Sequence, residues 1–128
     1  MLQRDQITNL HWQMDAGSSD LADGRIVTDV RDLEQSIRHA LMTRPGSCPL
    51  SPERGLDLSA FRDRPSGVRH LFLGAAMRAC LERDVPRVVV DSLTADFSGF
   101  EKVVVTIAWR PRADVAEAFV TTEVTIDV

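Results

Sequence analysis

Residues 28–55 read TDVRDLEQSIRHALMTRPGSCPLSPERG, and this stretch decides how the N-terminal half folds. It predicts an amphipathic helix over residues 28–43. The helix must end near Arg44, because the residue before a proline is pushed out of the α region. Glu34 and Arg38 are four residues apart and are expected on the solvated face. The stripe expected to face the core comprises Val30, Leu33, Ile37, Ala40 and Leu41.

Composition bounds the class of protein. The chain has 128 residues, of which 44% are hydrophobic and 27% charged, as in one soluble globular domain spanning residues 1–128. No apolar run approaches the roughly 20 residues that a membrane helix needs. The N-terminus, MLQRDQITNL, lacks the pattern of a secretory signal, so we expect synthesis in the cytoplasm. A net charge of −4 argues against sequence-independent binding of nucleic acid.

Two segments are predicted to be irregular. Residues 1–27 contain many turn-forming residues, and Trp12 and Met14 are expected to anchor this arm to the domain. Residues 44–66 contain four prolines, which stiffen the path of the chain. The side chains expected to pin this second segment to the core are Leu56, Leu58 and Phe61.

The C-terminal half predicts one helix followed by three strands. The helix would be capped by Ser66 and end near Arg83, and the strands would cover 87–93, 102–109 and 119–128. Short connections favour an antiparallel meander, so we predict an α+β domain with two helices packed on a three-stranded antiparallel sheet. The apolar face of this second helix is expected to comprise Val68, Leu71, Phe72, Ala75, Ala76, Ala79 and Cys80.

The sequence shows no recognisable active site. No histidine or cysteine lies in a metal-ligand spacing, and we expect neither a metal nor another cofactor. Cys80 lies on an apolar stripe and is expected to pack as a small hydrophobe. There is no glycine-rich phosphate loop, and nothing selects a pair of carboxylates for glycoside hydrolysis.

The last predicted strand could instead be an interaction site. An edge strand exposes unpaired amides and carbonyls that can accept a partner strand. The alternative, equally compatible with the residues alone, is an ordinary edge protected by its acids. The residues we assign to protein binding on this strand are Phe119, Thr121, Glu123, Thr125 and Asp127.

The sequence pattern of residues 32–55 resembles that of the baseplate wedge proteins of contractile-tailed phages. These form the gene product 25 and protein W family, which has relatives in type VI secretion baseplates. The pattern is an aspartate, hydrophobic positions around a glutamine, L-x-T-R-P-G and P-x-x-G. It is carried here by Asp32, Leu33, Gln35, Ile37, Leu41, Thr43, Arg44, Pro45, Gly46, Pro52 and Gly55.

The resemblance implies a structural subunit of the virion tail baseplate, assembled in the bacterial host cytoplasm, and not an enzyme. Its implied partners are other wedge proteins, the tail sheath protein, and tail tube or hub proteins, in a hexameric assembly without nucleic acid or membrane. The sheet would template the first sheath ring by accepting a sheath strand. The Arg44-Pro45-Gly46 turn and Pro86-Arg87 would contact neighbouring wedge subunits.

The sequence departs from the family pattern at three places. Val85 stands where the family has a glutamate before Pro86-Arg87. Ser47-Cys48 follow Gly46 where the family often has glutamate and arginine, and Arg54 stands where an aromatic residue is common. Two other functions therefore stay open, a soluble adaptor that binds a single regulator and a cell-wall-degrading, lysozyme-like enzyme.

Overall fold

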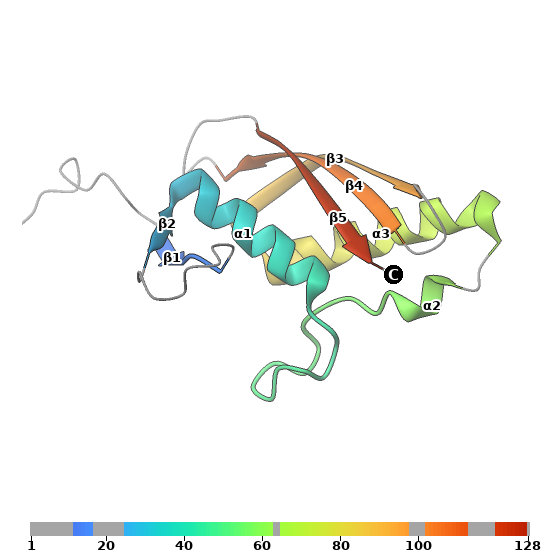
Figure 1. Ribbon diagram of the computed structural model, residues 1–128, viewed down its shortest axis with the longest axis horizontal. Coiled ribbons are helices and arrows are strands. Elements are labelled where there is room, and N and C mark those ends of the chain that lie inside the picture. The colour runs from blue at the N-terminus through green and yellow to red at the C-terminus, as the bar shows by residue number, and fades with distance from the viewer. Residues whose placement is uncertain (1–11, 17–24, 63–64, 98–101, 113–119, 128) are drawn as a thin grey trace, which may run out of the picture.

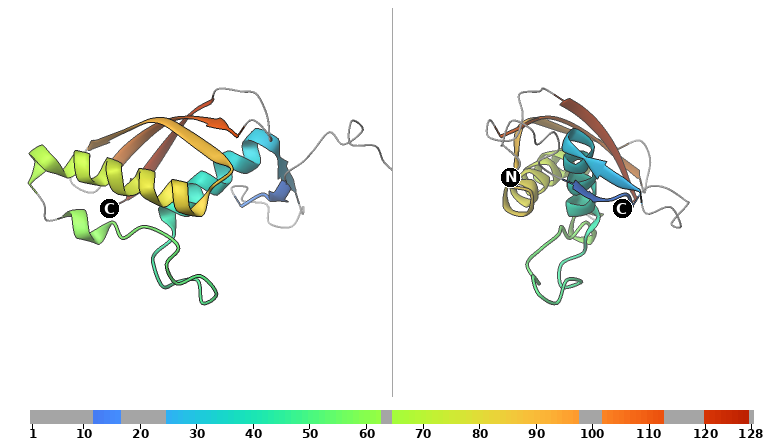
Figure 2. Two further views of the ribbon diagram at one scale, coloured as in Figure 1. Left: turned by 180° about the vertical axis from the view of Figure 1, so that it is seen from behind. Right: turned by 90° about the vertical axis from the view of Figure 1, so that its left-hand side faces the viewer.

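The computed structural model describes residues 12–16, 25–62, 65–97, 102–112 and 120–127. Figures 1 and 2 show two layers, a twisted sheet and a helical layer beneath one of its faces. The elements are β1 (Trp12–Met14), β2 (Ile26–Thr28), α1 (Asp29–Met42), α2 (Ser59–Arg62), α3 (Ser66–Asp84), β3 (Val88–Phe97), β4 (Lys102–Pro111) and β5 (Val120–Asp127).

The main sheet confirms the predicted α+β class. Its three strands are antiparallel in the order β3-β4-β5, so β4 is central and the other two are edges. β3 is longer than predicted and contains a register shift between Val90 and Ser92, typical of a β-bulge. Within the described residues, no helix is long and apolar enough to cross a membrane.

The core lies between this sheet and the two long helices. The stripe of α1 is buried as predicted, apart from Val30, which is partly buried at the margin. α1 ends at Met42, with Thr43 as its C-cap, as the Arg44-Pro45 pair requires. β4 supplies the centre of the core with alternate inward side chains, namely Val103, Val105, Ile107 and Trp109.

The predicted buried face of α3 was wrong. Leu71 and Phe72 are 65% and 51% exposed, and of the predicted face only Cys80 is fully buried; the other buried side chains are Leu73, Met77 and Leu81. The apolar residues of α3 extend over more than one stripe, so two different faces satisfy helical spacing. Contact with the sheet and α1 selects the second face, and Pro65 rather than Ser66 occupies the N-cap.

The N-terminal arm also differs from its prediction. β1 and β2 form a two-stranded antiparallel sheet, with Gln13 opposite Val27 and Met14 opposite Ile26. Val27 is buried, whereas Trp12 and Met14 are 65% and 70% exposed and do not anchor the arm. Successive side chains of a strand point to opposite faces, so Gln13 faces the domain while Trp12 and Met14 face away. Gln13 anchors the arm by donating hydrogen bonds to Asp32 and Ser36 of α1. The sequence stretch predicted as irregular after α1 likewise contains the short helix α2.

Candidate protein-interaction surfaces

β5 presents the surface that the sequence assigned to partner binding. Thr121, Glu123 and Thr125 are exposed, whereas Thr122 and Val124 are buried between them. Asp127 is the last residue of β5, and Phe119 lies outside the described residues. Because β5 pairs only with β4 in the described sheet, its other edge carries backbone groups that a further strand could use.

A buried polar relay holds β5 in place from its inner face. The indole nitrogen of Trp109 donates to Thr122 Oγ1 at 2.9 Å, and that hydroxyl donates to Glu34 Oε1 at 3.0 Å. The relay links β4, β5 and α1, and it satisfies the indole N–H in the core. Glu34 is half-buried, so the prediction that it lies on the solvated face holds only in part. Glutamate at a helix position beside the apolar stripe gave no signal of this role.

Arg87 lies just before β3 and makes its polar contacts within the chain. Its guanidinium donates to Asp32 Oδ2 at 3.0 Å and to Ser36 Oγ at 3.1 Å. The Asp32 side chain is 3% exposed and that of Arg87 is 34% exposed. Gln13 Nε2 joins the same cluster by donating to the backbone oxygen of Asp32 at 2.7 Å. This cluster joins β1, α1 and the start of β3, while Pro86 stays exposed.

The Arg44-Pro45-Gly46 turn opens a loop that projects away from the sheet (Figures 1 and 2). All three residues of the turn are exposed, and Gly46 adopts φ +81°. At the base of the loop, the Leu56 amide donates to the Thr43 carbonyl at 2.9 Å. Gly55, which directly precedes Leu56, adopts φ +106°. A Cβ at this position would be 2.3 Å from the carbonyl oxygen of Thr43.

The C-terminal end of α3 clamps this base. Asp84 Oδ2 accepts the Gly55 amide at 2.9 Å, and Arg83 donates to the Gly55 carbonyl at 2.8 Å and pairs with Asp84 at 2.9 Å. Burial acts to raise the pKa of Asp84, but hydrogen bonds from Arg83, Gly55 and Cys80 outweigh it and hold the pKa below its ordinary value. Burial and the Asp84 carboxylate raise the pKa of the Cys80 thiol to about 12. Cys80 is therefore an unreactive thiol at neutral pH.

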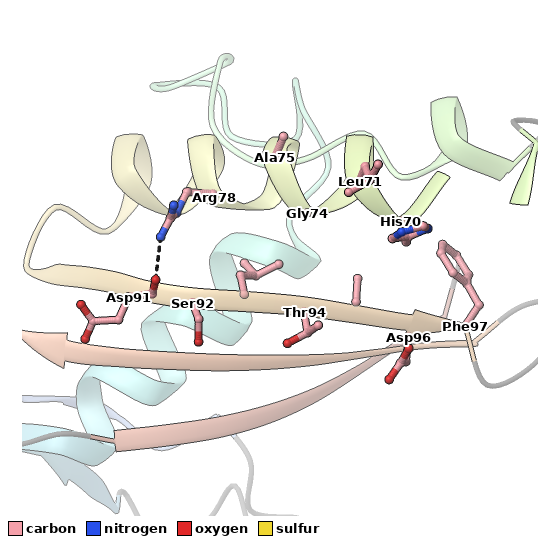
Figure 3. Close-up of a pocket in the computed structure, with 12 residues that line it drawn as sticks. His70, Leu71, Gly74, Ala75, Arg78, Asp91, Ser92, Thr94, Asp96 and Phe97 are labelled. Carbon is pink, nitrogen blue, oxygen red and sulfur yellow. Dashed lines mark hydrogen bonds between the residues drawn. The ribbon is translucent and has the colours of Figure 1, made fainter. Parts of the chain in front are cut away.

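A groove of about 710 Å³ runs between α3 and β3, and sequence reasoning missed it (Figure 3). Leu71 and Ala75 lie on its helical wall, and residues 91–97 form the opposite wall. Arg78 donates to the backbone oxygens of Val90 and Asp91 at 2.8 and 3.0 Å, which closes one end of the β3 edge. The signal that could have found this groove was the apolar pair Leu71 and Ala75, which were predicted from the sequence to face the core and which the core leaves exposed.

The acidic, histidine and cysteine side chains are candidates for metal ligands or catalytic groups. Among the residues that the structure describes, no group of three or more His, Cys, Asp or Glu side chains could hold a metal ion. Asp91 and Asp96 both line the groove, but both are exposed to solvent, and Asp91 lies 3.8 Å from Arg110.

Comparison with solved structures finds chains that share this fold. No family model matches the sequence, and no curated protein matches it. A crystal structure of a proposed tail lysozyme from Geobacter sulfurreducens is similar, with a TM-score of 0.59 and 18% sequence identity. The alignment covers 77% of this chain and 91% of that one. At this level of identity, the match shows that the two chains share a fold.

Proposed function

We propose that this chain is a structural baseplate subunit of a contractile tail or injection machine, and that its sheet accepts an extended strand of the tail sheath protein. The observation that carries the proposal is the open edge of β5, on a fold shared with a protein named for a phage-type tail. An added strand would continue the sheet by backbone hydrogen bonds, with Thr121, Glu123 and Thr125 beside it.

Other baseplate subunits would contact the helical side of the molecule, where the Arg44-Pro45-Gly46 turn is exposed. Tail tube or hub proteins and a hexameric arrangement complete the proposed setting. The sequence assigned Arg87 to partner binding, but its guanidinium is already bound to Asp32 and Ser36 within the chain. We therefore propose that Arg87 positions α1 against β3, and that only its exposed remainder touches a partner.

Strand addition can be tested by hydrogen exchange of the intact protein, with and without a purified tail sheath protein from the same source. Adding the sheath protein should slow exchange of the β5 amides that face away from β4, because they gain acceptors. Unchanged exchange along β5 in a sheath-bound sample would refute the proposal. Protection along β3 alone would move the site to the other edge. Deleting residues 119–128 is a poorer test, since it also removes the buried Thr122 and Val124.

The two alternatives make different predictions. A soluble adaptor would form a stable heterodimer with one partner and would join no ring in negative-stain images. A cell-wall-degrading enzyme would release soluble fragments from peptidoglycan, and this activity would disappear on substitution of one carboxylate. We expect no fragment release, and rings or wedges that contain this chain after co-expression with the proteins encoded beside it.

A further inference from the structure

The loop over residues 44–54 carries a large apolar side chain near the middle of its sequence, Leu50. Leu50 is 99% exposed, more than any other large hydrophobic residue in the described part of the chain. The loop projects from the helical layer on the side away from the sheet in every view (Figures 1 and 2). A leucine placed this way contributes nothing to the core.

This loop has a defined shape although it buries little surface. Backbone hydrogen bonds cross it from the Gly46 amide to the Pro52 carbonyl at 2.9 Å and from the Ser51 amide to the Cys48 carbonyl at 3.1 Å. The Ser47 hydroxyl donates to the Arg44 carbonyl at 2.6 Å. Three prolines restrict the remaining backbone freedom.

The base of the loop is fixed to two helices at once. Thr43 ends α1, and its carbonyl accepts the amide of Leu56, which is buried. Asp84 and Arg83 of α3 bind the amide and carbonyl of Gly55. Gly55 permits this close approach, because a side chain there would collide with the Thr43 carbonyl. The direction in which Leu50 projects is therefore set by the helical layer.

A preformed loop loses little conformational entropy when it binds, and full burial of a leucine is among the larger gains available to one contact. We propose that this loop is a docking element whose Leu50 enters an apolar pocket on a neighbouring baseplate protein. The stem mixes Arg44, Glu53 and Arg54, which suits a polar rim around such a pocket. It lacks the cluster of basic residues that an anionic lipid surface selects. The inference rests on the proposed function for the class of partner, but not on strand addition.

The test uses the full chain co-expressed with the proteins encoded beside it, followed by size-exclusion chromatography and titration of the protein that co-elutes. Leu50→Asp should weaken that complex by at least about tenfold, because a charge would enter an apolar pocket. Leu50→Met should bind within about threefold of the unchanged chain, since it keeps the volume and the apolar character. Leu71→Asp is the matched control, an exposed leucine changed on α3 away from the loop.

A photo-crosslinking residue at position 50 gives a second readout, which does not depend on affinity. It should crosslink to the co-eluting protein, whereas the same residue at position 71 should not. Equal binding of Leu50→Asp and the unchanged chain, or crosslinks only between copies of this chain, would overturn the inference and leave the proposed function standing. A chain that joins no complex at all would overturn both.

Discussion

Replacing Gly55 with alanine should destabilise the protein far more than the same change at Gly46. Both glycines have positive φ, +106° and +81°, so each substitution incurs a backbone cost of roughly 1–2 kcal/mol. The sites differ in their surroundings. A Cβ at Gly46 would meet nothing within 4 Å, whereas one at Gly55 would be 2.3 Å from the Thr43 oxygen and 2.8 Å from its carbon.

The extra cost at Gly55 follows from what must move. The atoms in collision belong to the backbone, so relief requires separating Thr43 from Leu56 and breaking their hydrogen bond. The same movement disturbs the bonds of Gly55 to Asp84 and Arg83. Losing one neutral and one charge-assisted hydrogen bond costs about 2–4 kcal/mol. With the backbone cost, Gly55→Ala should lose about 3–6 kcal/mol, against about 1–2 kcal/mol for Gly46→Ala.

Urea unfolding followed by far-UV circular dichroism measures both variants under one set of conditions. The midpoint of Gly55→Ala should fall well below that of Gly46→Ala, with similar slopes if both remain two-state. Free energies of unfolding within about 1 kcal/mol of each other would refute the reasoning. They would mean that the loop base relaxes without loss and is not a rigid clamp.

Three further predictions concern buried polar groups. Arg87→Ala should lower the free energy of unfolding by about 2–3 kcal/mol, because it leaves the buried Asp32 carboxylate without its cationic partner. Adding Asp32→Asn to that variant should restore part of the loss. No restoration would contradict the ion pair. Thr122→Val should cost about 1–3 kcal/mol by leaving the Trp109 indole N–H unpaired, and a neutral result would exclude the relay. Asp84→Asn should reduce the amount of stability that the protein loses in acid. The folded pKa of Asp84 lies below its ordinary 3.8, so the free energy that this carboxylate contributes to folding is present above that pH and is lost as the pH falls through the folded pKa. Thermal unfolding measured at a series of pH values can follow this loss.

The sequence predicted the elements whose pattern had one solution. The apolar stripe of α1 selects a single face, and apart from Val30 that face is buried. α3 offered two apolar faces, so spacing alone could not choose between them. The choice depends on α1 and the sheet, which are distant in sequence, and it determines the groove against β3.

The candidate site was predictable only where local chemistry was sufficient. The turn at Arg44-Pro45-Gly46 follows from proline and glycine, and β5 lies at an edge of the described sheet as expected for an antiparallel meander. The partners of Glu34 and Arg87 are 88 and 55 residues away in sequence, so no local pattern could reveal them. A charged residue reads as solvated in sequence until a distant donor or acceptor is known.

The two tryptophans of the chain lie in opposite environments, so intrinsic tryptophan fluorescence can report on both. Trp109 is fully buried, so its emission should shift to longer wavelength only when the core opens. Trp12 is 65% exposed on the outer face of the β1–β2 hairpin, where dissolved iodide can reach it. A change in iodide quenching without a shift in Trp109 emission would therefore indicate that something covers the hairpin while the fold stays intact. One fluorescence titration would then separate docking at this end of the molecule from unfolding.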